Sequence, residues 1–284
     1  MKKVAIVTDS TSYIPKELLG QYSIMVVPQV LIWGEKTYED GIDIQPDEFY
    51  QRLATAKTMP TTSQVSVPNM HKAFNGLLEQ GYDVLGIFLS AKLSGTMQSA
   101  IQGRELLEKD REHVEIVDSN TTAMALGFQV LTAARAASQG ASLAECKALT
   151  EQSRSHTGIY FVVDTLEFLH RGGRIGGAQR LLGTALNLKP ILTVADGKVE
   201  AAERIRTKAK AVERLLEIIG EQTGGKSPVR VATLHANAEA EAREVLSRVT
   251  KLTNATESVF TSVSPVVGTH TGPGTVGIAY MAGM

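Results

Sequence analysis

Residues 84–96 read VLGIFLSAKLSGT, and this stretch decides the fold class. The apolar run over 84–89 has the length of a buried strand, and a polar turn around Gly95 follows it. A helical pattern then extends from Thr96 to Lys109. We predict a strand, a turn and a helix in this order, which is the repeating unit of α/β proteins.

The same order recurs on both sides of this stretch. Apolar runs at 4–7 and 114–117 predict further strands, 24–32 predicts extended structure, and Pro60 to Gln64 predicts a loop. Helical patterns cover 49–54, 68–80, 121–139 and 142–154. Strands that alternate with helices predict a largely parallel sheet covered by helices.

Polar clusters follow three of these strands, at 8–10, 90–96 and 118–119. The carboxyl ends of parallel strands meet at one edge of a sheet, and ligands of open α/β sheets bind there. We therefore expect a ligand site at this edge.

The second half begins near Gly158. Strands are expected at 159–163, 190–194, 229–234 and 258–263, with helices at 166–170, 179–188, 207–220 and 237–250, and an apolar segment follows at 276–281. The chain has 284 residues, enough for two domains, and we predict that these span residues 1–158 and 159–284.

The composition excludes several classes of function. Lys and Arg total 29 against 30 Asp and Glu, so the chain lacks the basic surplus of a nucleic-acid-binding protein. The N-terminus lacks the apolar run of a signal peptide, and no window resembles a membrane span. The single cysteine, Cys146, suits a reducing compartment. We expect a cytoplasmic protein with no integral membrane segment.

Sequence motifs for metals and cofactors are missing. There is no CxxC, HExxH, Walker loop or GxSxG elbow, so we predict neither a bound metal nor a cofactor. The spacing Gly272-x-Gly274-x-x-Gly277 matches a dinucleotide fingerprint. Too few residues follow it for the helix and acidic residue which that site requires.

Three segments carry groups that can hold an anion. Ser94 and Gly95 precede a helix, whose free N–H groups attract a carboxylate or phosphate. Thr62 and Ser63 place hydroxyls in a predicted loop, and His270 stands in a predicted loop rich in glycine. The ordinary alternatives are helix capping, a plain polar loop and an incidental histidine.

Two further segments carry cations. Arg171 and Arg174 flank a Gly-Gly turn, and Arg206 precedes a predicted helix. Such side chains can contact phosphate or an acidic partner, or they can simply be solvated.

These motifs together resemble the DegV family of bacterial fatty-acid-binding proteins over residues 4–280. The resemblance rests on the order of six segments: VTDST at 7–11, PTTSQ at 60–64, LSGT at 93–96, LEFL-x-RGGRI at 166–175, LKPIL at 188–192 and GTHTGPG at 268–274.

The resemblance implies a lipid-binding protein, not an enzyme, with a long-chain fatty acid between its two domains. The site residues that it implies for the head group are Thr62, Ser63, Ser94, Gly95, His270, Thr271 and Arg206.

The resemblance also implies a partner. Some family members present the fatty acid to a separate fatty acid kinase, which makes an acyl phosphate for phospholipid metabolism. Arg171 and Arg174 would then lie on the kinase-docking surface. Two alternatives remain: an acyl-ester hydrolase using Ser94 and His270, and a regulatory module that binds another small anion.

Overall fold

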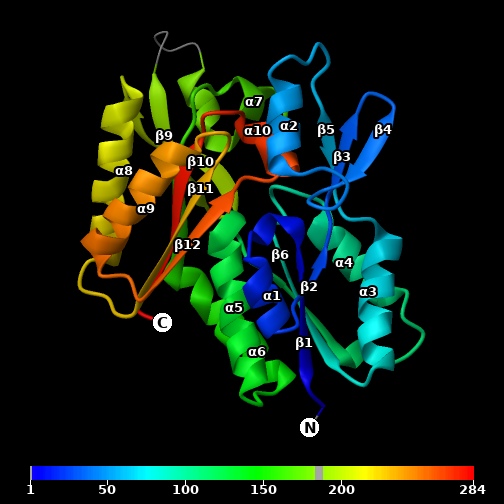
Figure 1. The fold of residues 1–284 in the computed structure, drawn as a ribbon. Helices are drawn as coiled ribbons and strands as arrows, with labels where there is room; N and C mark the ends of the chain where they lie inside the picture. The colour runs from blue at the N-terminus through cyan, green and yellow to red at the C-terminus, as the bar shows by residue number, and fades with distance from the viewer. Residues whose placement is uncertain (1, 183–187) are drawn as a thin grey trace.

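The computed structural model describes residues 2–182 and 188–284, and its fold is α/β (Figure 1). Its first sheet is wholly parallel, with the strand order β2-β1-β6-β7. The strands are β1 (Val4–Asp9), β2 (Met25–Val27), β6 (Asp83–Phe88) and β7 (Val114–Asp118). The predicted parallel sheet of the first half is confirmed.

The second sheet is mixed and has the order β10-β9-β8-β13-β11-β12, in which only β11 and β12 are parallel. It consists of β8 (Thr157–Val162), β9 (Lys189–Ala195), β10 (Lys198–Ile205), β11 (Val229–His235), β12 (Glu257–Ser262) and β13 (Val276–Ala282). The sequence did not predict β10. This edge strand carries several charged residues and therefore lacks an apolar run.

A small antiparallel sheet of β4 (Lys36–Glu39), β3 (Val30–Trp33) and β5 (Thr61–Ser63) stands apart from both. The predicted loop at 60–64 is wrong over Thr61–Ser63, because these residues pair with β3. Three polar residues after a proline carry no strand signal of their own, so only the neighbouring strand makes them extended.

Helices form layers on and between the two large sheets (Figure 1). The first sheet is covered on its outer side by α3 (Val67–Glu79) and α4 (Thr96–Glu105), and the second by α8 (Lys208–Thr223) and α9 (Glu239–Thr253). Between the sheets lie α5 (Ala123–Ser138) and α6 (Leu143–Ser153), and α5 contacts both sheets.

The hydrophobic core crosses from one half to the other through α5. Residues 123–131 of this helix are all buried, as expected for a helix with apolar contacts on every side. A single cluster joins Ile6 of β1, Phe128 of α5 and Met281 of β13. The sheets change between β7 and β8, but the shared core leaves the division at residue 158 a prediction.

Short helices gather above the carboxyl ends of β1 and β6 (Figure 1). Among them, α2 (Pro46–Leu53), α7 (Glu167–Arg171) and α10 (Pro265–Thr271) contain few residues, and α1 (Lys16–Gln21) lies lower, beside β1. Single turns of 3-10 helix occur at Ser10–Ser12, Arg111–His113 and Arg154–His156, and a longer one at Gly176–Leu181.

Two helix predictions need correction. His270 lies in α10 and not in a loop: the helix begins at Pro265 and ends before Gly272, whose φ is 75°. Within the predicted helix at 179–188, residues up to Leu181 form a 3-10 helix, and 183–187 fall outside the described residues. Over the described parts of the chain, no helix is long and apolar enough to cross a membrane.

Candidate ligand-binding site

A cavity lies between the carboxyl edge of the parallel sheet and one face of the mixed sheet. About 840 Å³ of its space is not filled by protein atoms, and part of that space is open solvent. Residues that follow all four parallel strands line it: Thr11 and Tyr13 after β1, Gln29 after β2, Leu89, Leu93 and Ser94 after β6, and Thr122 and Ala123 after β7.

The opposite wall is apolar and comes from the mixed sheet. Ile159 and Phe161 are two residues apart on β8, so their side chains lie on the same face of the sheet, and both line the cavity. The same wall contains Val194, Val199 and Leu234, from β9, β10 and β11. A long hydrocarbon group placed here would be removed from water on most sides.

One end of the cavity, called the polar end below, contains Thr62, Arg174 and His270, which also line a neighbouring pocket. Thr62 Oγ1 lies 2.8 Å from His270 Nε2, although the two residues are 208 positions apart in the sequence. Thr62 is the central residue of β5, and its side chain is less exposed than those of Thr61 and Ser63. Ser63 and Ser94 also line the cavity, so the structure brings together three of the segments singled out from the sequence.

His270 is a neutral imidazole at pH 7. Burial, and secondarily the charge of Arg174, lower its pKa from 6.5 to about 4. Its Nδ1 is buried and has no hydrogen-bond partner among the described residues. The ring lies so close to Gly172 that a Cβ atom there would overlap it.

Ser94 lines the cavity but is not the N-cap of α4, because the N-cap residue is Gly95. Its Oγ accepts a hydrogen bond from Thr96 N at 3.3 Å. Gly95 is not among the lining residues. A Cβ there would lie 3.0 Å from the Gln64 side chain, which occupies the space beside the glycine.

Arg174 lies at the polar end of the cavity. Its Nε donates to Leu93 O at 3.1 Å and its Nη1 donates to Gly172 O at 2.7 Å. Arg171, by contrast, is exposed and pairs with Glu167 at 2.5 Å. The role of both arginines in partner binding stays a prediction.

A second, outer pocket adjoins the cavity at this end. It shares Thr62, Arg174 and His270 with the cavity and adds surface residues such as Phe168 and Arg171. The outer pocket therefore leads from exposed residues such as Arg171 to Thr62 and His270.

The two remaining residues predicted for the head group, Thr271 and Arg206, differ in their position relative to the cavity. Thr271 lines the cavity and donates its hydroxyl to Val267 O at 3.2 Å. Arg206 is exposed beyond the end of β10 and is not among the lining residues of the cavity or of the outer pocket. Its contact with a head group stays a prediction.

Sequence reasoning missed Gln29, Tyr13, Thr11 and Thr122 as lining residues. For Gln29 a signal existed, because it is the one strongly polar residue in the apolar stretch 25–33. It is 2% exposed, and its Nε2 donates to Thr96 Oγ1 at 2.8 Å.

The geometry does not support hydrolysis by Ser94 and His270. A serine nucleophile needs a hydrogen bond to the base, whose other nitrogen is held by a third group. Ser94 bonds instead to Thr96, His270 bonds to Thr62, and His270 Nδ1 has no partner. The low pKa also makes His270 a weak base near pH 7.

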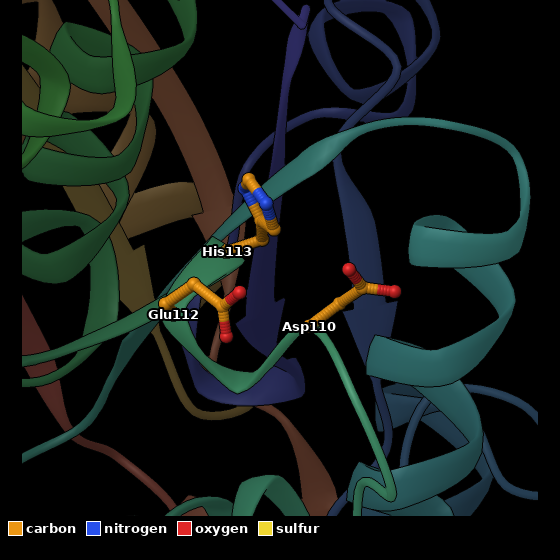
Figure 2. Close-up of side chains that lie close together, drawn as sticks. All are labelled: Asp110, Glu112 and His113. Carbon is orange, nitrogen blue, oxygen red and sulfur yellow. The ribbon is translucent and has the colours of Figure 1, made fainter.

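The described residues include one group that could hold a metal ion, Asp110, Glu112 and His113, around the turn before β7 (Figure 2). Their ligand atoms lie within 4.8 Å of one another. His113 Nδ1 is already 2.8 Å from Asp83 Oδ1. This turn is at the amino end of β7, opposite the edge that carries the cavity, so it takes no part in the site.

Fold and cavity together define a class of α/β protein with a largely apolar cavity between two sheets. The chain belongs to the DegV family, because the family model described as "Uncharacterised protein, DegV family" matches residues 3–283. A DegV domain-containing protein of Clostridium perfringens is 36% identical over 279 residues and covers 98% of both chains.

Two solved structures share the fold. A DegV family protein from Thermus thermophilus, described as binding fatty acid, has 36% identity and a TM-score of 0.89 and covers 99% of both chains. DegV from Bacillus subtilis, described as a fatty acid binding protein, has 33% identity and a TM-score of 0.90, covering 99% of this chain and 100% of its own.

Proposed function

We propose that this protein binds a long-chain fatty acid, with the acyl tail along the apolar walls and the carboxylate at Thr62, Ser94 and His270. The observation that carries the proposal is the cavity itself, whose lining is mostly apolar and includes the hydrogen-bonding side chains of Thr62, Ser94 and His270. The fatty-acid binding described for the Thermus thermophilus and Bacillus subtilis proteins supports it.

The energetics of the tail favour this ligand. Each buried methylene contributes roughly 0.8 kcal/mol, so a C16 chain contributes about 10 kcal/mol before entropy costs. Residues such as Phe161 and Val199 provide the apolar surface for it.

The head group requires compensation, because burying an isolated carboxylate is costly. The hydroxyls of Thr62 and Ser94 can donate to it, and neutral His270 can donate from one ring nitrogen. Arg174 places a positive charge at the same end of the cavity.

The second part of the proposal is that a separate fatty acid kinase phosphorylates the bound carboxylate, as a step toward phospholipid synthesis. The outer pocket supports this part, since it reaches Thr62 and His270 from the surface and includes Arg171.

We propose a cytoplasmic location, where the buried thiol of Cys146 would stay reduced.

Mass spectrometry of a solvent extract from natively purified, detergent-free protein tests the first part. We expect a fatty acid at close to one per chain, reduced in the Ser94→Ala and His270→Ala variants. A blank extract followed by no uptake of added palmitate would refute fatty-acid binding and favour a small anion as the ligand.

The kinase step is tested separately, with a bacterial fatty acid kinase, ATP and protein loaded with palmitate. Acyl phosphate that forms only when both proteins are present supports presentation. Fatty-acid binding without acyl phosphate would leave the binding function and remove the kinase.

A further inference from the structure

Asp40, just after β4, is a buried carboxylate that is not among the residues lining the cavity. It is 2% exposed. Its Oδ1 accepts a hydrogen bond from Val266 N at 3.1 Å, and its Oδ2 accepts one from Ser10 Oγ at 2.7 Å. These two bonds lead in different directions, and each reaches a different part of the head-group site.

The bond to Val266 holds the start of α10, the helix that carries His270. The side chain of Ser264, at the N-cap position, makes no capping bond, and Asp40 accepts from a first-turn N–H instead. A carboxylate at this end of a helix is also favoured by the helix dipole. The seven residues of α10 include two valines, two threonines and a glycine, which are weak helix formers, so its position depends on such contacts.

The bond to Ser10 leads to Ser94. Ser10 Oγ accepts from Gln29 N at 3.1 Å, and the Gln29 side chain donates to Thr96 Oγ1 at 2.8 Å. Thr96 Oγ1 in turn lies 3.0 Å from Ser94 Oγ. Ser10 is only partly exposed, and Gln29 and Thr96 are buried. Such a connected network restricts the orientation of its members.

We propose that Asp40 is a positioning residue for the carboxylate site. It fixes the position of α10, which carries His270, relative to Ser94 on the opposite side of the site. This inference rests on the fatty-acid function proposed above. Asp40 touches neither the cavity nor its contents, and its effect passes through Val266 on one side and Ser10 on the other.

The charge state of Asp40 sets the conditions for a test. Burial is the main cause that raises its pKa to about 6, while hydrogen bonds with Ser10, Val266 and the side chain of Ser264 oppose the rise and the nearby charge of Asp9 adds to it. Tyr13, whose hydroxyl accepts from Ser264 N at 3.1 Å, faces the same region and stays protonated. At pH 7.5 Asp40 is therefore mostly ionised, and binding should be measured there.

The test compares palmitate with hexadecanol, which has the same tail and no carboxylate. Affinities of delipidated protein for both are measured at pH 7.5. We expect Asp40→Ala to weaken palmitate binding about tenfold and hexadecanol binding less than about twofold. Asp40→Asn keeps an acceptor for Val266 N and should lose less. A variant that merely loosens the fold would weaken both ligands alike.

Two further variants keep the test decisive if Asp40→Ala folds poorly. Ser10→Ala removes the bond to Asp40 and the bond to Gln29 but leaves the bond between Asp40 and Val266, so it should give an intermediate, palmitate-selective loss. Asp83→Ala is the matched control, because it removes a half-buried carboxylate bonded to His113 at the other end of the sheet, and it should change neither affinity.

The outcomes separate the two proposals. Equal losses for both ligands, or unchanged palmitate binding in both Asp40→Asn and Ser10→Ala, would overturn the role of Asp40 and leave fatty-acid binding in place. Wild-type protein that binds neither ligand would overturn the fatty-acid function and the role of Asp40 with it.

Discussion

Replacement of Gly172 by alanine should displace His270 without straining the backbone. Gly172 has φ −76° and ψ −7°, which alanine adopts freely. An added Cβ would overlap His270 Nδ1 and lie 2.8 Å from Cε1, while Phe168 O is 3.1 Å away on the other side. The main chain cannot yield as readily as a ring, so the imidazole must move.

The size of the loss in palmitate affinity follows from the contacts that the displaced His270 ring no longer makes. Moving it breaks the 2.8 Å contact with Thr62 and removes a donor from the proposed carboxylate position. A hydrogen bond to a charged group contributes about 1.5–3 kcal/mol, which corresponds to a roughly 10- to 150-fold weaker Kd for palmitate. Isothermal titration of delipidated protein at pH 7.5 measures this change.

The neighbouring glycine provides the control. Gly173 has φ 70° and no atom within 4 Å of an added Cβ, so Gly173→Ala strains the backbone without touching His270. It should lower stability by about 1 kcal/mol and leave the affinity unchanged. In a His270→Ala background, Gly172→Ala should have no further effect on binding. A wild-type affinity of Gly172→Ala for palmitate would refute the reasoning. So would a double variant that binds palmitate more weakly than His270→Ala alone.

Three further predictions concern the same end of the cavity. Ser94→Ala should weaken palmitate binding about tenfold in a fluorescent fatty-acid displacement assay, whereas Arg206→Ala should leave it unchanged because Arg206 lies outside the lining residues. Because the pKa of His270 is lowered to about 4, the folded protein should lose stability as the pH falls from 6.5 through 4, by at most about 3 kcal/mol. Denaturant unfolding at several pH values should show a shallower decline for His270→Asn, and an identical slope would contradict the assignment. Arg171→Glu should reduce acyl-phosphate formation by the kinase without changing palmitate affinity, since Arg171 is exposed in the outer pocket, and unchanged turnover would remove it from the docking surface.

Hydrophobic periodicity was sufficient to predict most of the fold. The runs at 84–89 and 114–117 are buried strands with helices between them, and they form the parallel sheet that this order implies. The largely apolar sequence of α5 likewise reflects its position between two sheets. In these elements local pattern and tertiary burial agree, so the sequence alone carries the information.

The elements that sequence reasoning predicted wrongly are those whose conformation depends on contacts with other segments of the chain. Thr61–Ser63 is extended because it pairs with β3, and β10 is a strand because it pairs with β9. The helix of His270 has a poor helical sequence and depends on Asp40 and Tyr13 at its start. No local pattern encodes such contacts, because they join segments far apart in the chain.

The site shows the same division, and the two sheets explain it. Parallel strands share one carboxyl edge, so Ser94 could be placed at a ligand site from strand order alone. Antiparallel strands share no such edge, and the mixed sheet contributes residues such as Phe161 and Leu234 from its face instead. Strand order therefore predicts the polar end of this cavity better than its apolar wall.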